Sequence, residues 1–247
     1  MRTTEPTVAE GGAAPAERPR DAGMSLAELM VALGIFTLIL VVVGSTAVAA
    51  IRTVGGMENR VDNAAQAELG LSSMSKVLRT AVLPQQLDAG SCPTCADVAV
   101  TLATATQVTF HANLGRSSIG PSLVTLSVLQ DPAKPGTAIL EQRTIDPTPG
   151  ASGSYTFCTP GSGGCRVERR VLARSLVWPT AAVFSYYDTD GVLMTGSSLS
   201  AVQKAKISSV DVVLTAQTRP GQDRWPPFTA VQRIRLPNVE ISSTITE

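Results

Sequence analysis

The chain has 247 residues and is electrically balanced, with 20 Lys plus Arg against 20 Asp plus Glu. This balance does not favour a nucleic-acid-binding protein or a protein specialised for acidic substrates. Once a terminal extension and one membrane span are set aside, the remaining length suffices for one domain of ordinary size.

The first 22 residues consist mainly of Ala, Pro, Glu, Gly and Arg and contain almost nothing that a core could bury. Such a composition predicts disorder. We therefore expect no folded element before Gly23.

A long apolar run follows, and it contains no charged residue from Leu29 to Ala50. About 20 residues in a helix, at roughly 1.5 Å each, cross a hydrocarbon core of about 30 Å. One carboxylate, Glu28, lies at the start of this run. A carboxylate near lipid costs free energy, so it needs a partner, and that partner is the main functional clue.

The residues around Glu28 read Gly23-Met24-Ser25-Leu26-Ala27-Glu28-Leu29. This segment resembles the cleavage and methylation motif of type IV prepilins and pseudopilins. The resemblance implies that a prepilin peptidase cuts after Gly23 on the cytoplasmic side and methylates the new amino terminus of Met24. Glu28 then becomes the fifth mature residue.

The same resemblance implies four regions: a cytoplasmic leader (1–23), a transmembrane helix (24–51), an amphipathic continuation (52–83) and an extracytoplasmic β-rich domain (84–247). It also implies an assembly role, in which the Met24 amine of one subunit pairs with Glu28 of a neighbour inside a dry helical bundle. Two alternatives stay open, namely a plain single-pass anchor and a secretory signal cut near Ala47-Val48-Ala49. A secretory signal would leave Glu28 unexplained.

The helical pattern continues beyond the span. Apolar residues recur at steps of three, four or seven at Met57, Val61, Ala64, Leu71, Met74 and Leu78. This spacing predicts one buried helix face, and Pro84 ends the pattern. The segment from 24 to about 83 is either one helix or two helices hinged at Gly55-Gly56.

Four cysteines lie beyond the span, as the pairs Cys92/Cys95 and Cys158/Cys165. In an oxidising compartment the simplest arrangement is one disulfide within each pair. A zinc site made of all four cysteines and a redox role for Cys92-x-x-Cys95 are the alternatives.

From about residue 97 onward the sequence predicts β-strands separated by Gly, Pro and Asp clusters. The expected strands are 98–102, 107–111, 123–129, 138–145, 166–172, 182–187, 209–215 and 229–236. Together with the N-terminal helix they predict an α+β fold, in which a helix packs on an antiparallel sheet.

Residues 182–191 and 207–214 resemble the C-terminal sheet of the J-type minor pseudopilins of type II secretion and of the related W-type minor pilins. Within the first segment, Asp188-x-Asp190-Gly191 could begin a calcium loop. A hairpin turn explains the same residues more simply, because the downstream Glu of an EF-hand is missing.

No catalytic set is visible in the sequence. His111, the only histidine, lies on a predicted strand without a nucleophile beside it. The arginines Arg166, Arg169, Arg170 and Arg174 predict the solvated face of a strand, or alternatively a DNA-contacting stripe with Trp178 and Trp225 as stacking partners.

The sequence therefore predicts a minor pilin or pseudopilin that is a structural subunit and not an enzyme, with no cofactor or metal. Its expected partners are a prepilin peptidase, other pilin or pseudopilin subunits and the membrane. A DNA-binding minor pilin of a DNA-uptake pilus is the alternative function.

Overall fold

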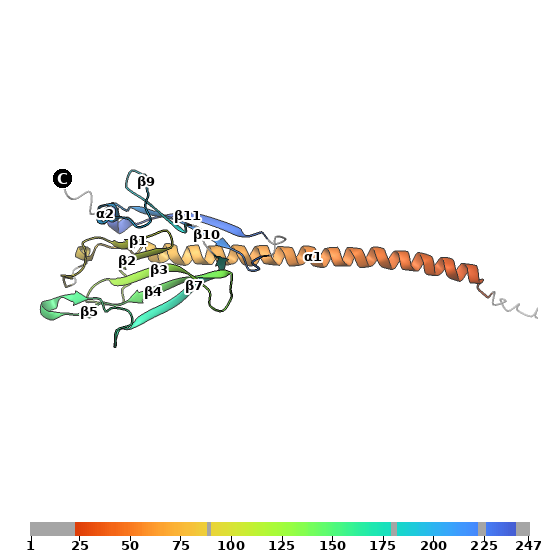
Figure 1. Cartoon of the computed structure of the whole chain (residues 1–247), viewed down its shortest axis with the longest axis horizontal. Helices are drawn as coiled ribbons and strands as arrows, with labels where there is room; N and C mark the ends of the chain where they lie inside the picture. Colours follow the sequence, from red (N-terminus) through yellow and green to blue (C-terminus); the bar gives the residue numbers. More distant parts are fainter. Residues whose placement is uncertain (1–22, 88–89, 179–181, 222–225, 241–247) are drawn as a thin grey trace, which may run out of the picture. The chain divides into compact units, whose positions relative to one another are not determined.

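The computed structural model describes residues 23–87, 90–178, 182–221 and 226–240. All of the expected leader except Gly23 therefore lies outside the described residues. The chain divides into two compact units, Met1–Arg52 and Thr53–Glu247. From Leu26 onward the first unit is helical, and the second contains the sheet (Figure 1).

One helix, α1 (Leu26–Leu78), runs without a break through Gly55-Gly56, so the two-helix alternative is wrong. The helix also ends earlier than the expected residue 83. A tightened turn closes it, with Thr80 N–H donating to Val77 O and Ala81 N–H to Leu78 O. The chain then becomes extended, because Ala81 forms a β-bridge with Ala112. A short 3₁₀ turn, Pro84–Gln86, follows.

The C-terminal part of α1 buries one face against the sheet, but this face differs from the predicted one. Leu71, Met74 and Leu78 are buried as expected, whereas Met57 and Val61 are 63% and 66% exposed. Their places on the buried face are taken by two amides, Asn59 and Asn63.

Both amides are buried because they bind the loop that follows β10 (Ser209–Ala216). Asn63 Oδ1 accepts from Thr218 N at 2.8 Å, and Asn59 Oδ1 accepts from Thr218 Oγ1 at 3.3 Å. A buried amide is tolerated when its hydrogen bonds are made, so this face of the helix is polar near the start of the second unit.

The sheet is antiparallel throughout, in the order β1-β2-β3-β4-β7-β10-β8-β9, with β11 added to β10. Its bounds are β1 Val100–Ala103, β2 Gln107–Ala112, β3 Ser122–Gln130, β4 Thr137–Ile145, β7 Val167–Val177, β8 Phe184–Tyr187, β9 Leu193–Met194 and β11 Phe228–Arg235. All eight predicted strands are present, and the α+β fold class is confirmed. A second, two-stranded sheet joins β5 (Thr148–Pro149) to β6 (Tyr155–Thr156).

Two short helices complete the second unit. In α2 (Ala201–Ala205), Ser200 forms a capping box with Gln203, which explains how so short a helix is held. The other, α3 (Pro237–Glu240), follows β11 directly. Asn238 ties it to the end of α1 by donating to Arg79 O and accepting from Gln86 Nε2.

The core lies between α1 and the inner face of the sheet, and alternate residues of β3, β4 and β10 are among its members. Gly70 marks the closest approach of helix to sheet. A Cβ at this position would lie 2.8 Å from Leu214 Cδ1 and 3.0 Å from Ala173 Cβ. Only glycine lets the helix backbone come this near.

Candidate processing and assembly site

The expected cleavage point lies just before α1. Gly23 and Met24 precede the first helical residue, Leu26, and both are exposed. No atom beyond the chain neighbours of Gly23 lies within 4 Å of where its Cβ would be. The Gly23–Met24 peptide bond therefore lies outside the helix and is exposed, as a cleavage site requires.

The first turn of α1 is closed by a pair of reciprocal hydrogen bonds that the sequence analysis missed. Glu28 N donates to Ser25 Oγ at 3.2 Å, and Ser25 N donates to Glu28 Oε2 at 3.0 Å. This is a capping box, which satisfies two of the free N–H groups at a helix start. The spacing Ser-x-x-Glu before an apolar run is its signal, so the sequence carried enough information to predict it.

The capping box gives Glu28 a role in the single subunit. Its carboxylate points back toward the start of the helix, beside the residue that becomes the amino terminus if cleavage follows Gly23. A carboxylate has two oxygens and about four acceptor positions, so Glu28 can keep its bond to Ser25 and still accept from an ammonium group.

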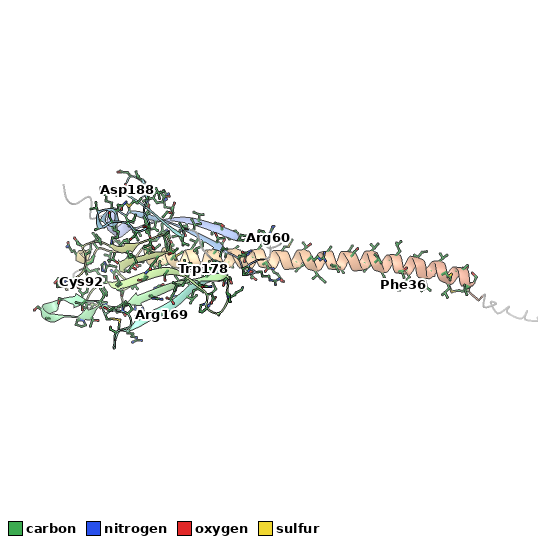
Figure 2. All side chains as sticks on the ribbon, in the orientation of Figure 1. Phe36, Arg60, Cys92, Arg169, Trp178 and Asp188 are labelled. Atoms are coloured by element: carbon green, nitrogen blue, oxygen red, sulfur yellow. A yellow bond between two sulfur atoms is a disulfide. The ribbon has the colours of Figure 1, made fainter. Side chains whose placement is uncertain are left out.

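The helix that follows has the surface of a membrane span. Its large side chains from Leu29 to Val43 are all at least half exposed, and Figure 2 shows Phe36 projecting from the helix. The hydroxyls inside the span are satisfied locally. Thr37, Ser45 and Thr46 donate to carbonyls three or four residues earlier, at 2.8–3.0 Å. A lipid-facing helix requires this, because lipid offers its polar groups no partners.

Among the described residues, α1 is the one helix long and apolar enough to cross a membrane. The apolar stretch stands near the N-terminus and is unburied within the chain itself. These properties fit an N-terminal membrane anchor.

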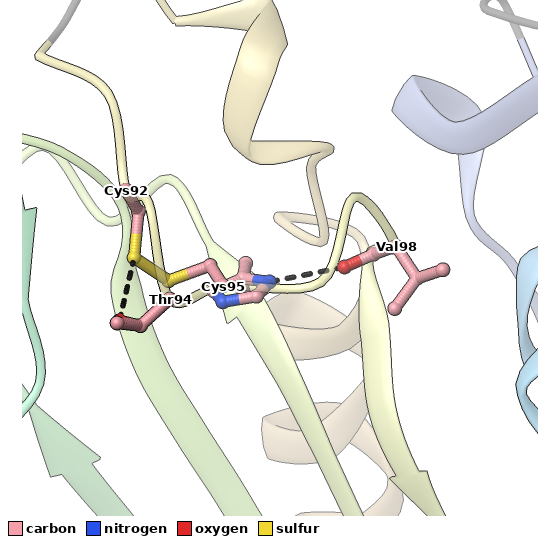
Figure 3. Close-up of a disulfide and its surroundings, with 5 residues drawn as sticks. Cys92, Thr94, Cys95 and Val98 are labelled. Atoms are coloured by element: carbon pink, nitrogen blue, oxygen red, sulfur yellow. Dashed lines mark hydrogen bonds between the residues drawn. A yellow bond between two sulfur atoms is a disulfide. The ribbon is translucent and has the colours of Figure 1, made fainter.

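Each cysteine forms a disulfide with the cysteine nearest to it in the sequence. Cys92 is bonded to Cys95, and Cys158 to Cys165. Figure 3 shows the first pair in a turn, with Thr94 Oγ1 3.8 Å from Cys92 Sγ. In this turn Cys95 N donates to Cys92 O. A thioredoxin-like motif instead lies between a strand and a helix, so this geometry does not support the redox alternative.

His111 lies on β2 and is 1% exposed, more deeply buried than the half-buried position that its strand predicts. Its Nδ1–H donates to Val98 O at 3.1 Å, and its ring packs 5.7 Å from that of Phe157. Burial lowers the pKa of the imidazole below 6.5, and the bond to Val98 offsets this only in part. The ring is therefore a neutral, hydrogen-bonded member of the interior.

The arginines of β7 lie on an exposed surface, with Arg169 projecting from the sheet in Figure 2. One of these arginines, Arg174, pairs with Asp131 at 3.6 Å. Glu168, an acid on the same strand, pairs with Arg116 outside the strand at 2.6 Å. Trp178 is half-buried against the core, so its ring is not a free stacking surface, and Trp225 lies outside the described residues.

The Asp188–Gly191 segment forms the turn between β8 and β9. Asp188 Oδ1 accepts from the backbone N–H groups of Asp190 and Val192 at 3.0 and 2.8 Å. Gly191 adopts a φ of 76°, which favours glycine. The hairpin turn accounts for these residues, since one carboxylate oxygen of Asp188 is already used by the backbone.

Across the ranges that the structure describes, no three His, Cys, Asp or Glu side chains gather as a metal site would require. The four-cysteine zinc site is therefore not supported. One charged pair joins two strands of the sheet: a bidentate hydrogen bond from Arg233 on β11 lowers the pKa of Asp211 on β10.

Comparison with known proteins agrees with the geometry at the start of α1. Residues 18–44 match the family model of the prokaryotic N-terminal methylation motif. The match contains Gly23, Met24 and Glu28, and it supports a type IV pilin-like, membrane-anchored subunit. Neither the curated proteins nor the solved structures contain a match to the chain.

Proposed function

We propose that the chain is a minor pilin or pseudopilin, a non-catalytic structural subunit of a type IV pilus or a type II secretion pseudopilus. The observation that carries the proposal is the methylation motif at residues 18–44, placed on an open Gly23–Met24 bond ahead of an exposed apolar helix. An enzyme on a membrane anchor would need a cluster of acid and base groups, and the described residues offer no support for one.

The proposal assigns a role to each residue of the site. Gly23 is the last leader residue, Met24 becomes the methylated amino terminus, and Glu28 receives the amine of a neighbouring subunit. The leader is cytoplasmic, residues 24–51 span the membrane, residues 52–83 continue the helix, and residues 84–247 form an extracytoplasmic domain with Cys92–Cys95 and Cys158–Cys165 oxidised.

The finer assignment to the J-type pseudopilins or W-type minor pilins rests on weaker support. Strands β8 and β10, which carry the similar segments, pair with each other from Ser209↔Tyr187 to Val212↔Phe184. A prepilin peptidase and other filament subunits are the partners that this assignment requires.

The first prediction concerns processing. We expect a prepilin peptidase to cut after Gly23, because that bond is non-helical and exposed, and to leave N-methylated Met24. Mass spectrometry of the N-terminus of membrane-extracted protein measures this. A Gly23→Leu variant should accumulate as full-length precursor, while Gly34→Leu, on the exposed helix, should be cut normally. A mature N-terminus near Ala50 would instead show ordinary signal cleavage and remove the proposal.

The DNA-uptake alternative is not part of the proposal. Arg174 of β7 pairs with Asp131, Glu168 adds a negative charge to the same strand, and no exposed ring is described beside these arginines. Tight duplex binding that falls steeply with added salt would restore this alternative.

A further inference from the structure

Strand β11 forms an open edge of the sheet. It pairs with β10 along its whole length, from Ser209↔Arg235 to Ala216↔Phe228, and no other described strand pairs with it. Val231 lies opposite Val213 of β10. The N–H of Val213 points away from β11 and donates to Val183 O at 2.9 Å. Because β10 does not use them, the N–H and C=O of Val231 point toward the open side.

A groove of about 450 Å³ runs between this edge and α1. Its walls are Glu68, Leu71, Ser72, Ser75 and Lys76 from α1, Arg79 just after the end of α1, and Val231 and Gln232 from the strand. Val231 is 63% exposed, so nothing within the described chain covers this position of the edge. Small serines on the helix leave room for another extended chain beside β11.

The two ends of the groove carry opposite charge. Glu68 lies at one end, whereas Lys76 and Arg79 lie two to three turns further toward the end of α1. No described residue forms an ion pair with any of these three side chains. Unpaired charges of opposite sign at the ends of a groove favour an occupant of complementary charge.

The direction of β11 relative to α1 excludes a second copy of the same edge. Asn63 of α1 contacts Pro226 just before β11, and Arg79 contacts Asn238 just after it, so strand and helix run the same way. Antiparallel pairing of two β11 strands would turn the Thr53 ends of the two copies in opposite directions. Subunits of the proposed filament all point the same way, so two copies of the second unit cannot pair in this manner within it.

We propose that β11 and its groove bind, by antiparallel strand addition, an extended segment of a different neighbouring subunit of the filament. The segment carries carboxylates where it enters beside Lys76 and Arg79 and a basic residue where it leaves beside Glu68. Main-chain hydrogen bonds supply the attraction, and the charges set the direction. The identity of the neighbour rests on the proposed function, whereas the chemistry of the groove does not.

Peptide binding to the full chain in detergent tests the groove. The probe is a blocked, fluorescent eight-residue peptide with two Asp at its start, alternating Val and Thr, and Lys at its end. We expect it to bind about fivefold more tightly than the same peptide with Asp and Lys exchanged. Equal affinity for the two peptides, or no binding of either, would overturn the proposal.

Two matched variants locate the binding. Val231→Pro removes the outward N–H without costing a bond to β10, and should weaken binding about fivefold or more. Val231→Thr keeps that N–H and should bind within about twofold of the wild type. The double variant Lys76→Glu with Arg79→Glu should prefer the exchanged peptide, which keeps the test decisive even where Val231→Pro fails to accumulate.

Other occupants give distinct results. Binding that appears only after truncation at Glu240 would show that the chain's own last residues cover the edge, and dimerisation abolished by Val231→Pro would show self-pairing. Either result overturns the proposal. In cells, Val231→Pro should be processed at Gly23 yet depleted from filaments. Normal incorporation would reject the neighbour segment, whereas failed processing of the wild type would count against the proposed function alone.

Discussion

Glu28 has two tasks, and they use different properties of its side chain. In the single subunit its oxygen accepts from Ser25 N, which helps to start α1. In a filament, as proposed, its negative charge offsets the amine of a neighbour. A glutamine can perform the first task but not the second, because a capping box accepts Glu or Gln. Substitutions at Ser25 and Glu28 can therefore separate the two tasks.

We predict that Glu28→Gln and Glu28→Ala reach the membrane at normal levels but fail to enter filaments. Removing the acid leaves the incoming amine unpaired in a dry bundle, at a cost of about 3–5 kcal/mol. Ser25→Ala should lose only the cap, about 1 kcal/mol, and still assemble. Co-purification with filament subunits, normalised to membrane level, measures this. Normal assembly of Glu28→Gln would show that the charge is not needed.

His111 gives the fold a dependence on pH. Its imidazole has a lowered pKa in the folded state, so below pH 6.5 the unfolded chain binds a proton that the folded chain resists. Stability should therefore be full above about pH 7.5 and fall as the pH decreases through 6.5. The expected readout is a lower unfolding temperature of the full chain at pH 5.5 than at pH 7.5.

The variant His111→Gln provides the control for this dependence. An amide can still donate to Val98 O but does not titrate, so the part of the pH effect between 7.5 and 5.5 that belongs to His111 should disappear. An unchanged pH dependence in His111→Gln would assign the effect to other groups. Asp211 is not one of them, because its pKa is lowered and its stabilisation is lost only in more acidic solution.

At the scale of elements, the packing of α1 on the sheet depends on Gly70. We predict that Gly70→Ala destabilises the second unit by about 1–3 kcal/mol, although alanine favours helices over glycine by about 1 kcal/mol. The added methyl would press on the buried side chains of Leu214 and Ala173. Chemical unfolding monitored by near-ultraviolet circular dichroism measures the change. Ser72→Ala, on the exposed helix face, is the control and should change stability by less than about 0.5 kcal/mol.

The strands were predictable from the sequence because alternation and turn residues are local signals. The eight expected strands all appear, and the differences are mostly one or two residues at their ends. The main exception is β7, which extends to Val177 because Leu176 pairs with both Ala138 and Ala216 across the junction of the two parts of the sheet. Such a junction depends on distant strands and leaves no local pattern.

The helix face shows a different limit. Apolar spacing correctly predicted that Leu71, Met74 and Leu78 are buried. It wrongly predicted burial of Met57 and Val61, because the buried residues there are two asparagines. Periodicity counts apolar side chains, whereas the bonds from Asn59 and Asn63 to Thr218 depend on a loop about 155 residues away. The two-residue strand β9 and helix α2 were too short to give a pattern. The capping box of Ser25 and Glu28, in contrast, was readable and was missed.

At the scale of the whole molecule, the chain separates a surface for lipid from a surface for solvent. The buried residues of the described chain begin at Asn59, and the core contains no residue of the first unit. The apolar side chains of residues 26–51 are exposed and have no function in the fold of the second unit. Two adjacent segments of one helix thus differ: one packs on the sheet, and the other is exposed and apolar, which fits a membrane anchor.

This separation predicts that residues 53–247 fold without the anchor. The second unit keeps its whole core, both cysteine pairs and the bonds of Asn59 and Asn63, so deletion of the first unit removes no buried contact. We expect a cooperatively unfolding monomer. The edge of β11 is only eight residues long and carries Arg233 and Arg235, which disfavour stable edge-to-edge pairing. Light scattering after gel filtration, with a thermal unfolding curve, measures both properties, and the full chain in detergent is the reference. A broad, non-cooperative transition would show that the anchor segment contributes to the fold. A stable dimer at micromolar concentration would show that an apolar surface of α1 or β11 remains to be covered.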